Sequence, residues 1–228
     1  MKLTFICFFC FITSVSFAQL DTYVGIGPAA AIFSSPNLFA IIDSFNTSPS
    51  QTNEMKYPSF LKGATFQVAS IDDYYFEYEL SFLGTTVSGD GNNSSGDHIY
   101  VDLRNMQFNF NAAYGYPIID ERYFLVGGIG IMGLMELTAT KITEDPNASG
   151  KFTNYDRGFN GGFNLFLLGG YTITDAIAVA AKPFFSMFFL GNEYHQTSFF
   201  LSPNSSFNIF DNAIEKVYGI KLTVGYNY

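Results

Sequence analysis

Hydrophobic and polar residues alternate along most of this chain with a period of two, a pattern typical of β-strands whose two faces meet different environments. The clearest example is the segment Tyr74–Val87. Its apolar face carries Tyr74, Phe76, Tyr78, Leu80 and Phe82, and its other face carries Tyr75, Glu77, Glu79 and Ser81. Five large apolar residues do not suit a water-facing surface, and two glutamates do not suit an apolar core. The segment therefore predicts a strand with lipid on one face and a polar lumen on the other.

Further segments have the same character, although the first two of them are weaker. They are Tyr23–Phe33, Phe60–Ile71, Met106–Tyr114, Leu125–Ile131, Phe163–Leu167, Ile177–Phe185 and Val217–Tyr228. The last strand would be an exposed edge in an open sheet. We therefore expect it to pair with the first strand and close a barrel. The pattern leaves the register of the first, second and fifth strands open to a shift of one residue.

The predicted connections alternate between short and long. The short ones are Asp72–Asp73, Pro117–Arg122 and Thr172–Asp175, and the long polar ones are Ser34–Ser59, Ser88–His98, Thr138–Arg157 and Gly191–Ala213. This arrangement is typical of outer-membrane barrels, in which the short turns face the periplasm. The fold predicted is an all-β, eight-stranded antiparallel up-and-down transmembrane β-barrel with short periplasmic turns and long extracellular loops. No amphipathic helix is expected, and a hairpin hidden in the first or fourth long loop would raise the count to ten strands.

The first residues have the three-part pattern of a secretory signal peptide. Lys2 supplies the positive charge, Leu3–Phe11 is an apolar run rich in Phe, and Ser16-Phe17-Ala18 is a small-x-small cleavage site. We expect residues 1–18 to be removed and residues 19–228 to form the barrel domain. Both cysteines fall inside the signal segment, so the mature chain is expected to have no disulfide, thiol catalysis or Cys-ligated zinc.

The composition agrees with a membrane barrel better than with a soluble domain or a helical membrane protein. Aromatic residues make up 18% of the chain and charged residues only 14%, where about 25% charged is usual for a soluble domain. Beyond the signal segment no apolar run is long enough for a membrane-spanning helix. The net charge of −9 gives no electrostatic footprint for nucleic acid.

Four short stretches together resemble the small outer-membrane β-barrel domain family, the OmpA/OmpX-type eight-stranded barrels. They are Phe17-Ala18-Gln19, Phe76-Glu77-Tyr78-Glu79-Leu80-Ser81, Gly127-Gly128-Ile129-Gly130 and the closing stretch from Tyr218 to Tyr228. The resemblance implies a bacterial outer-membrane location. The final strand, with spaced apolar residues and a terminal aromatic, resembles the signal read by the outer-membrane assembly machinery. The family supplies no catalytic residues.

Four charged residues are expected inside the barrel. Glu77 and Glu79 share the inward face of the third strand, and Lys182 and Lys221 face inward on the seventh and eighth. The interior of an eight-stranded barrel is just filled by side chains, and isolated charges there are costly, so we expect these residues to pair. The interpretation favoured is a polar plug that holds the barrel closed; a gate or proton path is the alternative.

Catalytic and metal chemistry find little support in the sequence. His98 and His195 lie in long loops, and the nearness of Asp97 to His98 in sequence does not establish a catalytic geometry. The loop Asp90–Asp97 begins like a calcium loop, but Ser95 stands at the glycine position and the closing Glu is missing. We expect no enzyme activity, no cofactor and no metal.

Apolar residues gather in two of the long loops. The first loop contains Leu38, Phe39, Ile41, Ile42 and Phe45, and the fourth contains Phe199, Phe200, Leu201, Phe207, Ile209 and Phe210. One interpretation is that these runs are strand extensions that pack on each other above the membrane. The other is a surface that binds an extracellular ligand, with Phe39, Phe199 and Phe200 as candidates.

The function predicted is therefore that of an integral outer-membrane protein with a structural or surface-interaction role. A narrow pore or a transporter of small or hydrophobic molecules is the alternative. A soluble, secreted, lipocalin-like barrel is a second alternative, in which the apolar strand faces would point inward around a ligand. The partners expected are outer-membrane lipid, the assembly machinery and an extracellular ligand of unknown type, with no nucleic acid.

Overall fold

The computed structural model describes most of the chain beyond the predicted signal segment. The described residues are 22–48, 50–92, 95–120, 122–145, 148, 150–189, 192, 194–201 and 213–227. The predicted signal peptide, Tyr228 and the apolar run Phe207–Phe210 lie outside these ranges.

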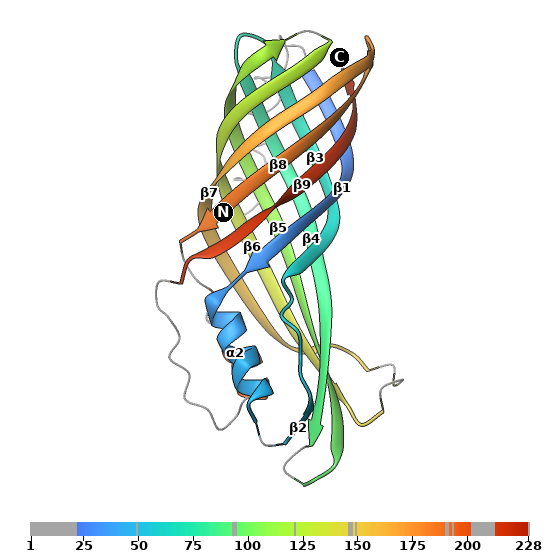
Figure 1. Ribbon diagram of the computed structural model, residues 1–228, viewed down its shortest axis with the longest axis vertical. Helices are drawn as coiled ribbons and strands as arrows, with labels where there is room; N and C mark the ends of the chain where they lie inside the picture. The colour runs from blue at the N-terminus through green and yellow to red at the C-terminus, as the bar shows by residue number, and fades with distance from the viewer. Residues whose placement is uncertain are drawn as a thin grey trace, which may run out of the picture.

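Eight antiparallel strands close into a barrel, as the sequence predicts (Figure 1). They follow the order β4-β3-β1-β9-β8-β7-β6-β5, and β5 pairs again with β4. The first and last strands are neighbours, with Tyr23 opposite Asn227 and Ser34 opposite Lys216, so the last strand is not an edge. The barrel strands are β1 Thr22–Ser34, β3 Phe60–Ile71, β4 Tyr75–Asn92, β5 His98–Asp120, β6 Tyr123–Thr143, β7 Thr153–Thr174, β8 Ile177–Phe188 and β9 Glu215–Asn227.

The predicted faces of the strands are also correct. On β4, Phe76 and Phe82 are exposed on the outside of the barrel, whereas Glu77 and Glu79 are buried. A belt of large apolar side chains surrounds the barrel on its outer face. It includes Ile26, Phe66, Phe76, Leu80, Phe82, Phe108, Ile129, Ile131, Leu165, Leu167, Ile220, Leu222 and Val224. A closed barrel with an apolar outside and a polar lumen is the architecture of a transmembrane barrel, and it contradicts the lipocalin-like alternative, which requires the apolar faces inside.

No helix among the described residues is long and apolar enough to cross a membrane.

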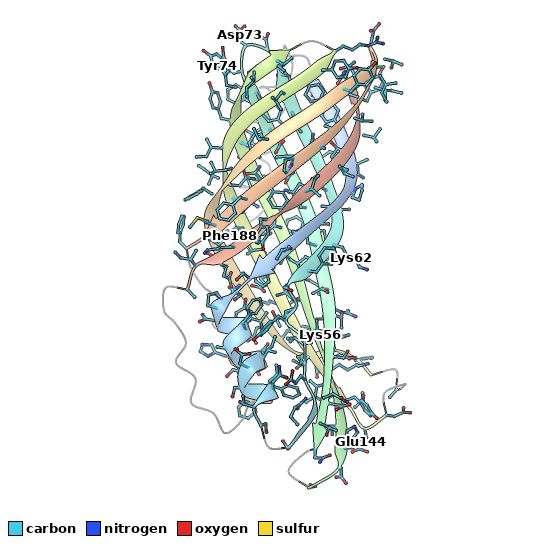
Figure 2. The ribbon with its side chains drawn as sticks, viewed as in Figure 1. Lys56, Lys62, Asp73, Tyr74, Glu144 and Phe188 are labelled. Carbon is cyan, nitrogen blue, oxygen red and sulfur yellow. The ribbon has the colours of Figure 1, made fainter. Side chains whose placement is uncertain are left out.

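Short turns lie at the end of the barrel that carries the C-terminus (Figure 1). Figure 2 shows Asp73 and Tyr74 in one of these turns and Glu144 at the opposite end of the molecule. In outer-membrane barrels the short turns face the periplasm. We call the opposite end, which holds the long connections, the mouth of the barrel.

Two of the connections predicted as long loops are mostly strand. β5, β6 and β7 have 23, 21 and 22 residues, whereas about 9–11 residues span a membrane. The ladder continues to Asn92 opposite His98 within the predicted loop Ser88–His98, and to Thr140 opposite Thr153 within the predicted loop Thr138–Arg157. These polar residues remain paired because β4, β5, β6 and β7 continue side by side beyond the length that spans a membrane, with Tyr100 on β5 opposite Thr143 on β6.

The first connection contains a helix that the sequence analysis did not expect, α2, Pro36–Asn46, followed by the short strand β2, Gln51–Asn53, which pairs with the end of β4. Ser35 caps the helix, because its side chain accepts a hydrogen bond from the Leu38 amide, and Pro36 occupies the first turn. The buried residues Leu38, Ile41, Ile42 and Phe45 follow the i, i+3, i+4, i+7 spacing of one helix face. The interpretation of these residues as strand extensions is therefore wrong, because their spacing is helical.

Helix α2 and a second short helix, α3, His195–Leu201, lie at the mouth and pack against each other. The buried side of α2 joins the same hydrophobic cluster as Leu61, Leu83 and Leu103 on the extended strands. We refer to α2, β2 and α3 as the cap.

Candidate functional site: two polar layers in the barrel lumen

The four charged residues predicted to face inward meet in the lumen. Lys182 on β8 forms ion pairs with Glu77 and with Glu79 on β4, the second at 3.0 Å, and Lys221 on β9 forms an ion pair with Glu79. Each of the four residues is only 1% exposed. In the barrel, β3 and β1 lie between β4 and β9, so these ion pairs cross the lumen from one wall to another. We call Glu77, Glu79, Lys182 and Lys221 the ion-pair layer.

The two carboxylates of the ion-pair layer also accept hydrogen bonds from neutral neighbours. The Tyr75 hydroxyl and the Asn111 side-chain amide donate to Glu77, and the Ser81 hydroxyl donates to Glu79 at 3.1 Å. A buried ion pair offsets its desolvation cost only when such additional hydrogen bonds satisfy the remaining lone pairs.

The two lysines of the layer are directly opposite each other on β8 and β9, an arrangement in which like charges repel. The carboxylates across the lumen compensate for this repulsion. Each ammonium also lies over an aromatic ring, Lys182 4.4 Å from the centre of Phe166 and Lys221 4.2 Å from that of Phe184. Gly128 makes room for the Phe166 ring, because a Cβ at this position would lie 2.3 Å from the ring.

A second polar cluster, nearer the mouth, contains acids and no base. The Tyr194 hydroxyl is 2.8 Å from Glu136 Oε2 on β6 and 2.9 Å from Glu215 Oε1 on β9. Ser35 donates to Glu215 Oε1 at 2.8 Å, and Asn160 donates to Glu215 Oε2 at 3.0 Å. We call Glu136, Glu215 and Tyr194 the acid layer. Within the described ranges, no Lys, Arg or His forms an ion pair with either glutamate.

The acid layer connects the barrel wall to the cap. Ser35 is the N-cap of α2, and Tyr194 immediately precedes α3. Tyr194 has a φ of 48°, a left-handed conformation that is strained for a bulky side chain. Burial, together with the nearby Glu136 and Glu215, raises the pKa of Tyr194 well above its ordinary value, so the hydroxyl keeps its proton and can donate to a carboxylate.

Asn192 is a further contact between the fourth connection and the acid layer. Its side-chain amide donates to Glu136, as does that of Asn105 on β5. Asn192 lies directly over Gly158, where a Cβ would be 1.5 Å from its Oδ1. Because Gly158 is the cross-strand partner of Glu136, the absence of a side chain there lets Asn192 reach the carboxylate.

A cavity of about 260 Å³ opens beside the acid layer. Its lining residues are Glu136, Thr138, Asp156, Arg157, Gly158, Asn192, Tyr194 and His195. The Asp156 carboxylate accepts the backbone amides of Gln196 at 2.9 Å and Thr197 at 2.6 Å and so begins α3.

The structure separates the candidate loop residues. Phe39 on α2 is partly buried and stacks on Tyr57 with ring centres 4.4 Å apart. Phe199 on α3 is 65% exposed, and the side chain of Phe200 lies outside the described residues. The two histidines are on different segments: His98 is 3.7 Å from Asp90, and His195 begins α3. The described residues contain no group of three or more His, Cys, Asp or Glu side chains that could hold a metal ion.

The acid layer was not predicted from the sequence. Glu136 continues the inward face of β6 beyond Ile131, the last residue of the predicted strand, and alternates with the outward Met135 and Leu137. Glu136 could have been found by continuing the period-two alternation of that strand past Ile131. No local pattern identifies Tyr194, because its place depends on the path of the fourth connection.

No family model matches the sequence, and no curated protein matches it. Among solved structures, the chain is similar to Ail, the attachment invasion locus protein of Yersinia pestis, with 10% identity, 92% of this chain and 99% of that chain covered, and a TM-score of 0.46. It is similar to Neisserial surface protein A, with 13% identity and a TM-score of 0.40; the match covers 91% of this chain and 97% of that chain. It is also similar to the outer membrane protein OprG from Pseudomonas aeruginosa, with 10% identity and a TM-score of 0.40; the match covers 92% of this chain and 96% of that chain.

At these identities and TM-scores the likenesses assign no activity. The closed barrel, its apolar belt and its polar lumen define the class of protein. The chain is an eight-stranded transmembrane β-barrel.

Proposed function

We propose that this outer-membrane barrel has a structural or surface-interaction role and no catalytic activity. The observation that carries the proposal is the ion-pair layer, in which charged side chains from β4, β8 and β9 meet across the lumen. The interior of an eight-stranded barrel is just wide enough for its own side chains. Ion pairs across such a narrow lumen act as a plug and leave the mouth as the part of the protein that meets other molecules.

The surface-interaction part of the proposal is supported by the cap. Helix α2 lies at the end opposite the short turns (Figure 1), α3 packs against it, and Phe199 on α3 is exposed. An extracellular ligand or partner would meet this end first. At the other end, we propose that the final strand is read by the outer-membrane assembly machinery, because its outward residues Tyr218, Ile220, Leu222 and Val224 form a regular apolar stripe.

A narrow pore is the second candidate, and one observation favours it. The side-chain amides of Gln67, Gln107 and Asn164 are buried in the barrel, and within the described part of the chain they have no hydrogen-bond partner. A buried amide without a partner is costly, and a hydrated lumen would satisfy it. For water and ions to pass, however, the ion-pair layer would have to open.

Conductance across a planar lipid bilayer separates the two candidates. The protein would first be shown to be folded by its shift in gel mobility on boiling, which reports a closed detergent-resistant barrel. If the ion-pair layer closes the lumen, we expect no single-channel events from this folded protein in 1 M KCl. Regular conductance steps from folded protein, absent in protein-free bilayers, would contradict the plug and favour the pore.

A further inference from the structure

The cavity beside the acid layer presents mainly hydrogen-bond acceptors from the barrel wall. Glu136 and Thr138 on β6 and Asp156 on β7 belong to the inward faces of their strands. Arg157 also borders the cavity, but it alternates to the outer face with the exposed Phe159. From the wall, the inward lining therefore consists of two acids and a threonine, and Arg157, the one basic wall residue among the described residues of the lining, belongs to the opposite face.

Glu136 and Glu215 form no ion pair with a basic side chain in the described ranges. Lys182 and Lys221 are both engaged in the ion-pair layer, and Lys216, next to Glu215, is exposed on the outer face. Among the described residues, the groups that donate hydrogen bonds to Glu136 are neutral, namely Asn105, Asn192 and Tyr194. Buried carboxylates normally have a cationic partner or lose their charge.

A second observation points to a ligand that donates hydrogen bonds. Thr138 lines the cavity and is only 1% exposed, yet its hydroxyl has no hydrogen-bond partner among the described residues. Its cross-strand neighbour on β5 is Asn105, whose side-chain oxygen is likewise buried and without a partner there. Such groups are uncommon in native proteins because each costs free energy. Both lie on the same strand pair as Glu136.

We propose that this cavity is a binding site for the primary ammonium group of a small soluble molecule. An ammonium group has three N–H donors and no acceptor, which matches a carboxylate and a threonine hydroxyl that line one cavity. The volume of about 260 Å³ lies below the roughly 300–1,000 Å³ of pockets that hold drug-sized ligands, which suits a short amine rather than a peptide. The exposed residue His195 on the rim places the entrance on the aqueous side, at the mouth.

This inference goes beyond the proposed function, which names no ligand, and it does not depend on whether the lumen conducts. Tyr194 and Asn192 lie between the cavity and the cap and also hold Glu136. A bound ammonium would therefore contact the same carboxylate that anchors the fourth connection.

Calorimetric titration of the full, detergent-purified protein with 1,4-diaminobutane tests the site. The titration is done at pH 7 in a phosphate buffer, which contains no competing amine, and 1,4-butanediol is the uncharged control of the same length. We expect the diamine to bind and the diol to give no heat. Glu136→Gln should weaken binding by about tenfold or more, because a hydrogen bond to a charged group is lost. Glu144→Gln, an exposed acid beyond the end of β6, should leave the affinity unchanged.

Thr138→Val separates a binding role from a structural one. Because the hydroxyl has no hydrogen-bond partner among the described residues, its replacement by a methyl group should not destabilise the barrel. We expect it to weaken diamine binding by about three- to tenfold. The proposal is overturned if the diamine gives no more heat than the diol, or if Thr138→Val and Glu136→Gln both bind as tightly as the original protein. The two glutamates would then be protonated and would serve only to hold the cap.

Discussion

The ion-pair layer and the acid layer lie in one lumen, but their buried carboxylates are stabilised by different kinds of partner. In the first, Glu77 and Glu79 are neutralised by two lysines. In the second, the donors to Glu136 and Glu215 among the described residues are neutral groups, including the Tyr194 hydroxyl and the Asn160 side-chain amide. Charge is thus balanced by ion pairs inside the ion-pair layer, whereas the acid layer forms no ion pair among the described residues.

The two layers also differ in the segments that they connect. Every charged residue of the ion-pair layer belongs to a barrel strand, so the layer ties wall to wall. The acid layer includes Tyr194 from the fourth connection, and its hydrogen bonds reach Ser35 at the start of α2. We infer that the ion-pair layer stabilises the barrel and that the acid layer sets the position of the cap. Changes in the two layers should therefore have different consequences.

The largest effect is expected from Lys182→Met, which keeps the volume of the side chain and removes its charge. Glu77 and Glu79 would be left close together with only Lys221 as a cation. Removing one partner of a buried ion pair typically costs about 3–5 kcal/mol. The free energy of unfolding, measured by urea titration of the protein in phospholipid vesicles, should fall by about this amount.

Lys62→Met is the matched control, because Lys62 on β3 is exposed on the outside of the barrel (Figure 2). It should change the free energy of unfolding by less than about 0.5 kcal/mol. Equal losses in the two variants would show that the ion-pair layer contributes no specific stability, and the contrast between the two layers would then fail.

Much of the fold could be predicted because period-two alternation is a local property of the sequence. The faces of β4 and β9 and the pairing of the first and last strands follow from it. Two of the short turns were predicted too long, because Pro117–Asp120 belongs to β5 and Thr172–Thr174 to β7. Helix α2 could also have been found, since Ser35-Pro36 and the spacing of Leu38, Ile41, Ile42 and Phe45 are local signals. The lengths of β5, β6 and β7 could not, because polar ribbon beyond a membrane has the composition of a loop.

The site was only partly predictable for a different reason. Facing inward is a local property, and it suffices to place Glu77, Glu79, Lys182 and Lys221 in the lumen. Which side chains meet across the lumen depends on register and barrel closure, which act over distances of more than a hundred residues in sequence. Tyr194 reaches Glu136 and Glu215 only through the path of the connection between β8 and β9.

A smaller effect, confined to the cap, is expected from Gly158→Ala. The new Cβ would lie 1.5 Å from Asn192 Oδ1, so Asn192 must leave its position over Gly158 and lose its hydrogen bond to Glu136. A lost hydrogen bond costs about 0.5–1.5 kcal/mol, part of which water at the mouth would restore. We expect faster protease cleavage within the connection between β8 and β9, while the barrel keeps its mobility shift on boiling.

Gly161→Ala on the same strand is the control, since a Cβ there has nothing within 4 Å. It produces the same change in the flexibility of the unfolded chain without disturbing Asn192. If both variants are cleaved at the same rate, Asn192 does not hold the fourth connection, and the role of the acid layer in placing the cap is wrong.

The smallest effect on stability is expected from Phe199→Ser on α3. Phe199 is 65% exposed, and substitutions at exposed positions usually change the free energy of unfolding by less than about 0.5 kcal/mol. Phe45→Ser on α2 is the comparison, because Phe45 is 7% exposed and loss of a buried phenylalanine costs about 3–5 kcal/mol. Resistance of the cap to protease at increasing urea concentration measures the stability of both variants.

A loss of stability for Phe199→Ser as large as that for Phe45→Ser would mean that Phe199 is part of the cap's packing, and the surface-interaction proposal would lose its best-placed apolar side chain. An unchanged cap would leave Phe199 as a side chain kept at the mouth at no benefit to folding, as expected of a residue that contacts another molecule.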